Sequence, residues 1–332
     1  MSAASVRMKV LTFIALLAAA FGCASEARSQ TYPSRAITVV VPYGPGGPAD
    51  LLARLMGERM RTILGQPIVV ENTAGAAGTL SVGRVARAAP DGYTLSYGNW
   101  GTHVLNGVIQ KVSYDVLTYL EPIILLPDNP YILVTNSNVP AQNLKELLAW
   151  LKANPDKVSQ GTGGVGSGSH VIGIYFQSIT GLRYQFVPYR QGTAAQTQDL
   201  LSGQIDMMFD QPVNALPHVR SGRLRAHAVL AKMRLAMAPD IPTVDEAGVP
   251  GLYVSTWYGL WAPKGAPKDI VGKLNAAAVE ALADPALRQR LADMGFDIPP
   301  RERQTPAALA AHHRAEIEKW SAIIKTANIK TE

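Results

Sequence analysis

Apolar and polar positions alternate along the chain in two periods, one typical of buried strands and one typical of amphipathic helices. Ile37–Val41 is a short β-branched run, which indicates a buried strand. Over positions 51–64 the apolar residues recur at helical spacing, which predicts a helix. The same alternation continues along the chain. Further strands are expected at 68–71, 94–97, 131–135, 158–161, 185–188, 205–209, 226–230 and 253–261, and further helices at 79–88, 144–152, 169–180, 194–201, 269–283, 285–294 and 306–327.

Strands that alternate with helices favour an α/β fold, with parallel sheets covered by helices on both faces. The roughly 300 residues that follow the amino-terminal segment are long for one such sheet, so two α/β domains are expected. We find no internal repeat and no low-complexity tract.

The amino-terminal segment has the pattern of a secretory signal peptide. Two basic residues precede an apolar stretch at 10–21, and small residues follow as far as Ala27. The apolar stretch is too short to span a bilayer. We expect residues 1–27 to form the signal peptide. Cleavage after Ala24, or lipid modification of Cys23, are the alternatives.

Composition and charge exclude several classes of protein. The chain is 47% hydrophobic and has one Cys, so it is neither disordered nor built on a disulfide or Cys-based metal framework. The net charge of +6 is spread along the chain. The nearest basic cluster, Arg54, Arg59 and Arg61, lies on one predicted helix and lacks the interleaved aromatics of a nucleic-acid binder. The six His are not spaced like metal ligands, and no metal site is expected.

Four predicted strand-to-helix junctions are rich in Gly, Ser or Thr: 43–48, 73–78, 161–169 and 191–193. Small residues let the backbone approach a ligand closely, and a helix N-terminus presents free N–H groups with partial positive charge. Such junctions lie at the carboxyl ends of the strands, where α/β proteins bind ligands. The pattern favours a site for a small anion such as a carboxylate. Tight turns without a ligand are the alternative explanation for any single junction.

Two of these loops also match a dinucleotide-binding pattern. Positions 44–49 read G-x-G-x-x-A, positions 161–166 read G-x-G-x-x-G, and Glu71 ends the next strand, near the place of a ribose-binding acid. However, Pro45 and Pro48 remove N–H groups that a pyrophosphate would use. Export would also separate the protein from the usual nicotinamide pool. We therefore expect no cofactor.

The search for catalytic motifs finds none. No Ser stands at the centre of G-x-S-x-G, and there is no H-E-x-x-H, P-loop or calcium-loop pattern. Asp50 falls in the first turn of a predicted helix, where an acid stabilises the N-terminus. No catalytic residue is expected.

Several polar and aromatic residues lie at the same junctions. His170 can reach a ligand or make a buried hydrogen bond. Arg190 is the best candidate for a direct charge partner, and a solvated arginine is the alternative. Asp210 would repel an anion, so we expect it to order a loop or to meet a donor group of the ligand. Tyr43, Trp100 and Trp257 lie near strand ends and can line a pocket or belong to the core.

A series of short motifs runs from Tyr32 to the C-terminus. The segments are YPSRAI (32–37), VPYGPGGPAD (41–50), VEN (70–72), PDGYTL (90–95), GSGSH (166–170), VPYR (187–190), GQID (203–206) through Asp210, PTVDEAG (242–248) and WYGL (257–260). Each motif is weak alone, but their order and spacing are specific. Together they resemble a known family, the periplasmic binding proteins of tripartite tricarboxylate transporters, also called Bug proteins.

The resemblance implies a two-domain periplasmic-binding-protein fold of type II, with the ligand in the interdomain cleft and two crossing strands as the hinge. Projected onto this chain, the first domain is discontinuous, 32–128 plus 255–332, and the second is 129–254. The Pro-Gly-Gly loop and the Gly/Ser loop hold a carboxylate in the family. The ligand-binding residues expected here, from the junctions and the resemblance together, are Tyr43, Gly46, Gly47, Trp100, Thr102, Gly166, Ser167, Ser169, His170, Arg190, Thr193 and Asp210.

Two departures from the family pattern bear on specificity. Ala49 replaces the usual Thr or Ser before the loop aspartate, so one hydroxyl contact is missing. Trp100 stands where many relatives have a small polar residue. We hypothesise that Trp100 lines the pocket and favours a flat or aromatic carboxylate.

The resulting expectation is a monomeric periplasmic solute receptor. It would not be an enzyme, would bind a small carboxylate, and would deliver it to the membrane subunits of a tripartite tricarboxylate-type transporter. The alternatives are a secreted α/β enzyme, either a hydrolase or a nucleotide-dependent one, and a sensory protein that presents its ligand to a membrane receptor. The sequence does not identify the carboxylate.

Overall fold

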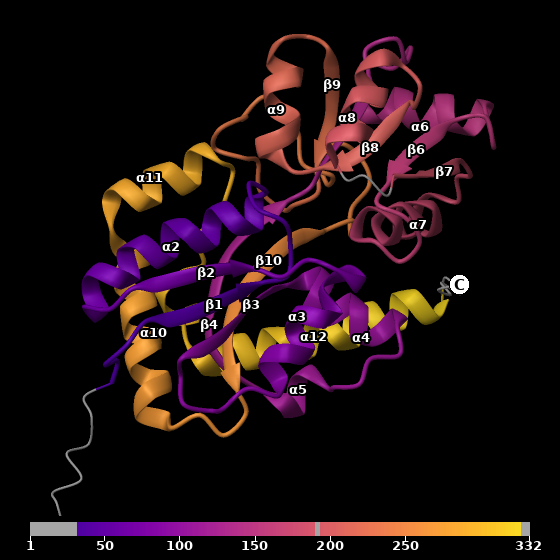
Figure 1. The fold of residues 1–332 in the computed structure, drawn as a ribbon. Coiled ribbons are helices and arrows are strands. Elements are labelled where there is room, and N and C mark those ends of the chain that lie inside the picture. Colours follow the sequence, from indigo (N-terminus) through magenta and orange to yellow (C-terminus); the bar gives the residue numbers. More distant parts are fainter. Residues whose placement is uncertain (1–31, 190–192, 327–332) are drawn as a thin grey trace, which may run out of the picture. The chain divides into compact units, whose positions relative to one another are not determined.

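Each apolar run that the sequence predicts as a strand lies in one of two five-stranded sheets of the computed structural model, which describes residues 32–189 and 193–326 (Figure 1). The expected signal peptide with Cys23, and Arg190, lie outside the described residues. The strands are β1 (Ile37–Val41), β2 (Ile68–Asn72), β3 (Thr94–Asn99), β4 (Leu120–Pro130), β5 (Ile132–Asn136), β6 (Ser159–Thr162), β7 (Gln185–Pro188), β8 (Met207–Asp210), β9 (Leu224–Val229) and β10 (Ser255–Pro263).

Helices lie at all eight places where the periodicity predicts them, and three further α-helices, at 106–109, 116–119 and 212–220, were not predicted. The α-helices are α2 (Pro48–Leu64), α3 (Thr79–Ala86), α4 (Asn106–Ile109), α5 (Val116–Tyr119), α6 (Leu144–Ala153), α7 (Gly168–Thr180), α8 (Thr193–Ser202), α9 (Pro212–Arg220), α10 (Lys268–Ala283), α11 (Pro285–Asp293) and α12 (Pro306–Thr326). Short turns of other helix types are η1 (Ala76–Gly78), η2 (Gly101–Leu105) and η3 (Arg301–Arg303). Among the described residues, no helix has the length and apolar character needed to cross a bilayer.

The first sheet has the strand order β2-β1-β3-β10-β4. β1 is parallel to β2 and β3, but β10 is antiparallel to both β3 and β4, so the sheet is mixed. The expectation of parallel sheets is therefore wrong. β10 reaches this sheet after a long excursion of the chain and not through a helical crossover, so its direction is not constrained to be parallel.

β4 was not predicted because three prolines interrupt its sequence, and proline is normally excluded from central strands. The structure places β4 at the edge of the sheet. The register with β10 shifts between Trp257 and Tyr258, whose partners are Asp128 and Leu126. Pro127 is thereby left out of the pairing, so its missing N–H disturbs no ladder bond.

The second sheet has the order β7-β6-β8-β5-β9 and is also mixed, because β5 runs antiparallel to β8 and β9. Ile132 and Val134 pack in one hydrophobic cluster with residues of α8 and α9, whereas Leu133 packs with residues of α6 and α7. β5 is therefore buried on both faces, which explains its continuous apolar sequence.

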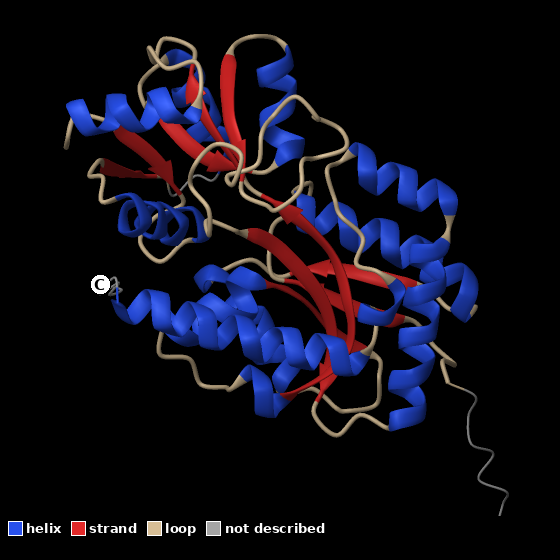
Figure 2. Ribbon diagram, turned by 180° about the vertical axis from the view of Figure 1, so that it is seen from behind, coloured by secondary structure: helices blue, strands red, loops and turns tan. Residues whose placement is uncertain are grey.

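Two strands connect the sheets. β4 leads directly into β5, and the chain returns at Ser255 into β10 (Figure 2). The strands stay joined at the crossing, because the Tyr131 N–H donates to the Val254 carbonyl at 3.1 Å and the Val254 N–H donates to the Leu230 carbonyl at 2.9 Å. In Figure 1, α2 and α10 lie on one side of the first sheet, and α3, α4 and α12 lie on the other. The loops that precede α2 and α7 are thus carried by different sheets.

Candidate functional site

The buried carboxylate of Asp50 holds the loop between β1 and α2. It accepts hydrogen bonds from the Gly46 N–H, from Arg54 Nε and from Asn72 Nδ2, each at 2.9 Å. Burial opposes ionisation, but these three hydrogen bonds outweigh it and lower the pKa of Asp50. Asp50 is thus ionised and shapes the loop. Gly46 has φ +87°, a conformation that side chains other than glycine rarely adopt.

In this loop Gly46 is exposed and Gly47 is partly exposed. α2 begins at Pro48, which has no N–H, so the first-turn N–H groups of Ala49 and Asp50 have no intrahelical acceptor. These groups are available to an acceptor beside Gly47, where the dipole of the 17-residue helix also favours negative charge.

Tyr43 joins this loop to the end of β3. Its hydroxyl donates to Asn99 Oδ1 at 2.8 Å, and the same oxygen accepts the Thr102 N–H at 3.1 Å. Burial raises the pKa of the Tyr43 phenol, so the group is a neutral donor. Thr102 is buried, and its hydroxyl lies 2.9 Å from Nδ1 of His103. Thr102 therefore orders the β3–η2 junction through its side chain.

Trp100 lies in an aromatic cluster beside that junction and is 1% exposed. Its ring centroid lies 4.7 Å from that of Trp320 on α12 and 6.5 Å from that of Tyr131. Its Nε1 is buried and has no hydrogen-bond partner among the described residues. The ring is thus packed as in a core, and one edge faces the loop that precedes α7.

That edge contact joins the two sheets. A Cβ added to Gly168, the first residue of α7, would lie 3.0 Å from Cζ3 of Trp100 and 3.4 Å from the Tyr131 hydroxyl. The Tyr131 hydroxyl in turn accepts a hydrogen bond from Thr256 Oγ1 at 3.0 Å. A side chain at this position would crowd Trp100, so glycine favours the close approach of the α7 N-terminus.

The Gly/Ser loop between β6 and α7 is ordered by its own side chains. Ser167 is the N-cap of α7 and accepts the His170 N–H at 3.3 Å. Ser169 Oγ accepts the Gly163 N–H at 3.0 Å, and His170 Nδ1 accepts the Gly166 N–H at 3.2 Å. Burial lowers the pKa of His170, which suits its role as a neutral acceptor. The remaining donors are the first-turn N–H groups of Gly168 and Ser169.

Asp210 ends β8 and is 4% exposed. Its Oδ1 accepts the Gln211 N–H at 2.7 Å and Asn214 Nδ2 at 3.2 Å. Burial raises the pKa of Asp210 to about 6, and its charge contributes to the raised pKa of Tyr131, which is due mainly to burial. Asp210 therefore orders the start of α9 close to Tyr131. Thr193 is exposed at the start of α8, and no hydrogen bond among the described residues joins it to the loops above.

Sequence reasoning missed residues that link the two loops. Asn99 is the acceptor that ties Tyr43 to Thr102. Tyr131 and Tyr258 lie within electrostatic reach of Tyr43, since each phenol contributes to the raised pKa of a neighbour, although burial is the main cause. A Tyr directly after β4 and an Asn at the end of β3 were visible as junction residues, but their partners come from distant parts of the chain.

The Glu71 side chain of the dinucleotide-like pattern is already engaged. It forms a two-pronged ion pair with Arg84 of α3. Hydrogen bonds from Arg84 lower the pKa of Glu71. No group of His, Cys, Asp and Glu side chains among the described residues is arranged to hold a metal ion. The loops thus offer neutral hydroxyls and helix N-termini, which suit an uncharged acceptor or an anion.

Comparison with known proteins agrees with this arrangement. Residues 52–329 match the family described as the tripartite tricarboxylate transporter family receptor. Among solved structures, the periplasmic binding protein BugD is 37% identical, with a TM-score of 0.80 over 91% of this chain and 100% of BugD.

Two further solved structures contain ligands. MatC from Rhodopseudomonas palustris, with bound malate, is 39% identical, with a TM-score of 0.79 over 88% of this chain and 100% of MatC. Rpa4515 from R. palustris, with adipate, is 31% identical, with a TM-score of 0.82 over 90% of this chain and 99% of that protein.

These comparisons show the family and the fold of the chain. The chain has the two-domain α/β fold of the periplasmic binding proteins, and it belongs to the tripartite tricarboxylate transporter receptor family, the Bug proteins.

Proposed function

We propose that this protein is a periplasmic solute receptor that binds a small carboxylate between its two sheets and presents it to the membrane subunits of a tripartite tricarboxylate-type transporter. The main support is the contact between Gly168 and Trp100, which brings the α7 N-terminus of one sheet against the β3 junction of the other. The Pro-Gly-Gly loop is tied to that same junction through Tyr43 and Asn99. Malate and adipate, the ligands of two relatives, are both dicarboxylates.

In this proposal, residues 1–27 direct export, and the mature protein acts as a monomer without a catalytic residue or cofactor. The lobes are 32–128 plus 255–332, and 129–254. The crossing at Tyr131 and Val254 is the hinge, because few backbone bonds join the lobes elsewhere.

The residues proposed to contact the carboxylate lie on both lobes. The N–H groups beside Gly46 and Gly47 would bind one oxygen, and those of Gly168 and Ser169 would bind another. The hydroxyls of Ser167 and Ser169 would add hydrogen bonds. Tyr43, Thr102, Gly166, His170 and Asp210 would hold these groups in place. Arg190 and Thr193 remain candidates for contacts near the α8 N-terminus. Binding by both lobes at once would favour the closed arrangement.

Thermal unfolding of residues 28–332 against a ligand panel tests the proposal. The panel contains malate, adipate, citrate, aromatic mono- and dicarboxylates, amino acids and NAD. A ligand at about 100 times its Kd adds about 2.7 kcal/mol of stability, which is a shift of several degrees. A shift with one carboxylate class is the expected result. A shift with NAD alone would overturn the proposal.

A variant pair locates the site. Ser167→Ala removes one hydroxyl of the Gly/Ser loop, whereas Ser202→Ala removes a hydroxyl at the distant end of α8. Calorimetric titration with the carboxylate found above should give weaker binding for Ser167→Ala and unchanged binding for Ser202→Ala. Equal affinities for the two variants would place the ligand elsewhere.

A further inference from the structure

A cavity of about 760 Å³ lies apart from the carboxylate site. Its walls come from three regions: the loop 230–237 after β9, the crossing segments 128–130 and 253–257, and first-lobe residues that include one face of α12. None of the twelve residues that the sequence assigned to the carboxylate site lines it. Its volume is that of an ordinary small-molecule pocket.

One part of the cavity wall is apolar and aromatic. Leu235 and Met237 of the loop line the cavity together with Phe296, Trp257 and Trp320. Such a lining favours a ligand with an apolar body.

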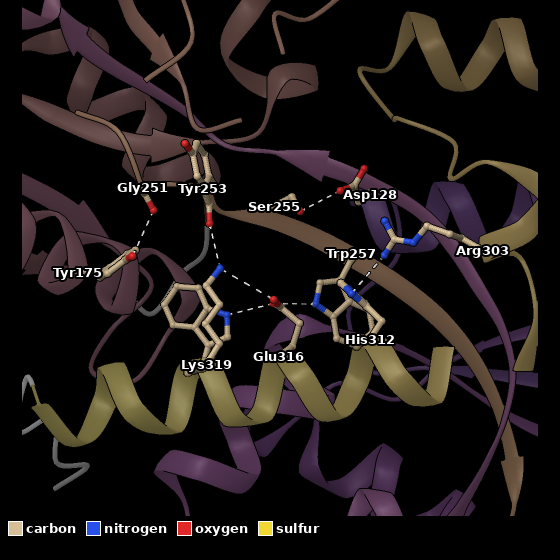
Figure 3. A network of polar contacts seen from close by, with 11 residues as sticks. Asp128, Tyr175, Gly251, Tyr253, Ser255, Trp257, Arg303, His312, Glu316 and Lys319 are labelled. Atoms are coloured by element: carbon tan, nitrogen blue, oxygen red, sulfur yellow. Dashed lines mark hydrogen bonds and ion pairs between the residues drawn. The ribbon is translucent and has the colours of Figure 1, made fainter. Parts of the chain in front are cut away.

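The acceptors at the α12 wall are already in use (Figure 3). Glu316 Oε2 accepts the indole N–H of Trp257 at 3.2 Å and that of Trp320 at 3.1 Å. Lys319 Nζ donates to the Tyr253 carbonyl at 3.2 Å and lies 3.9 Å from Glu316 Oε1. Glu316 and Lys319 therefore hold the aromatic wall together.

Two cationic side chains that line the cavity, Lys232 and Arg303, keep more of their N–H donors unused than Lys319 does. Lys232 lies 5.2 Å from the Tyr253 ring centroid and has no ion pair among the described residues. Arg303 donates to His312 Nδ1 at 3.4 Å and likewise has no carboxylate within ion-pair distance in the described part of the chain. Both side chains are exposed at the rim, where they keep several N–H groups for an acceptor.

His312 positions one of these side chains. A guanidinium can only donate, so Nδ1 of His312 accepts from Arg303 and Nε2 carries the hydrogen. Burial lowers the pKa of His312, which keeps the ring neutral. Nε2 is buried without a partner among the described residues, so it is not open to a ligand.

Besides Glu316, two carboxyls line the cavity. Asp128 accepts Ser255 Oγ at 2.9 Å, and burial raises the pKa of Asp128 to about 6. Asp297 is exposed, and its backbone pairs with that of Asp128. Lys232 and Arg303 nevertheless have no ion pair with a carboxylate among the described residues, and both line the cavity together with its apolar wall.

We propose that this cavity is a second ligand site, for an amphipathic anion with an aromatic or aliphatic body and one carboxylate or sulfonate group. The body would pack on Trp257, Trp320 and Phe296, and the anionic group would meet Lys232 or Arg303. This site goes beyond the proposed receptor function, since its residues are separate from the loops at Gly46 and Ser167.

Anilinonaphthalene sulfonate is a suitable probe because it has an aromatic body and one sulfonate. Its fluorescence, excited by energy transfer from tryptophan, reports binding to the protein, and equilibrium dialysis gives the stoichiometry. We expect saturable binding of one molecule per chain, with displacement by octanoate or phenylacetate and not by malate.

Variants decide whether the bound probe is in this cavity. Ala236→Trp places a large side chain at an exposed lining position and should abolish binding, whereas Ala276→Trp, at an exposed position of α10, should not. Lys232→Gln combined with Arg303→Gln should weaken binding about tenfold, a difference of about 1.4 kcal/mol, and Lys145→Gln on α6 should leave it unchanged.

Probe binding that persists in Ala236→Trp, or no saturable binding to the wild-type protein, would overturn the second site. Neither result bears on the carboxylate site, because the thermal shift with the panel is measured separately and is expected to be the same in Ala236→Trp as in the wild type.

Discussion

Gly168 is the position at which a single methyl group most directly tests closure of the two lobes. In Gly168→Ala the added Cβ would lie 3.0 Å from Cζ3 of Trp100 and 3.4 Å from the Tyr131 hydroxyl. Trp100 has little room to retreat, because it is 1% exposed and packs against Trp320 at a centroid distance of 4.7 Å. Closure in this arrangement should therefore be opposed by about 1–2 kcal/mol, at the lower end of the usual overpacking penalty.

The same change should not destabilise the lobe that carries it. Gly168 is the first residue of α7 and does not have a positive φ, so alanine fits the backbone and is a better helix former. The effect should appear in ligand affinity, as a loss of about 5- to 30-fold, and not in the melting temperature of the unliganded protein.

Calorimetric titration with the carboxylate that gives the largest thermal shift measures this loss. Gly272→Ala is the matched control, since Gly272 lies in α10 and an added Cβ there would meet nothing within 4 Å. The reasoning is refuted if Gly168→Ala binds within about twofold of the wild type, a difference of less than about 0.5 kcal/mol.

Three further changes test the buried polar groups and the aromatic contact. Asp210→Asn keeps an acceptor for both hydrogen bonds of Asp210 and removes a carboxyl whose pKa burial raises to about 6. An acid with a raised pKa destabilises the fold above that pKa. The free energy of unfolding of the variant should therefore rise by about 3 kcal/mol near pH 7.5 and change little near pH 4. Urea unfolding at both pH values measures this, and an equal gain at both would contradict it. Burial lowers the pKa of His313 to about 4, so the wild type should lose up to about 3 kcal/mol of stability from this group as the pH falls from about 6.5 to 4. His313→Gln, whose amide can donate to the His103 carbonyl, should show a flatter pH profile of stability. Parallel profiles for the two proteins would argue against this role of His313. Trp100→Phe should weaken aromatic carboxylates about tenfold more than malate if the indole favours flat ligands, and an equal loss for both classes by calorimetry would exclude that role.

The local sequence pattern predicted the helices and strands whose formation depends least on contacts with distant parts of the chain. The helical period and short apolar runs located nine of the ten strands of the described chain, with shifts of one or two residues at most ends. β4 was missed because Pro127 argues against a strand, and only its position in an edge bulge makes it tolerable. The predicted parallel direction was wrong because β10 pairs with β3 across more than 150 residues of sequence, and no local pattern records the direction of such a pairing.

For the candidate site, the sequence located the loops and not their contacts. Gly46 and Ser167 stand at helix N-termini, as the turn chemistry indicates. Two contacts depend on tertiary packing between distant segments of the chain. Tyr43 donates to Asn99, and Trp100 packs on Trp320 and does not stand free in a pocket. The environment of Trp257 also depends on tertiary packing, because this residue lines the cavity beside α12 and not the loops at Gly46 and Ser167.

The position of β10 in the first sheet has a consequence for the order of folding. The second sheet is built from β5 to β9, a continuous stretch of chain, and can assemble as soon as that stretch exists. The first sheet has β10 between β3 and β4, so β4 has no neighbour in that sheet until the chain has passed through the whole second sheet. Closing so long a loop is slow. The amino-terminal strands should therefore stay incompletely paired, and accessible to chaperones, until the carboxyl-terminal quarter of the chain has been made.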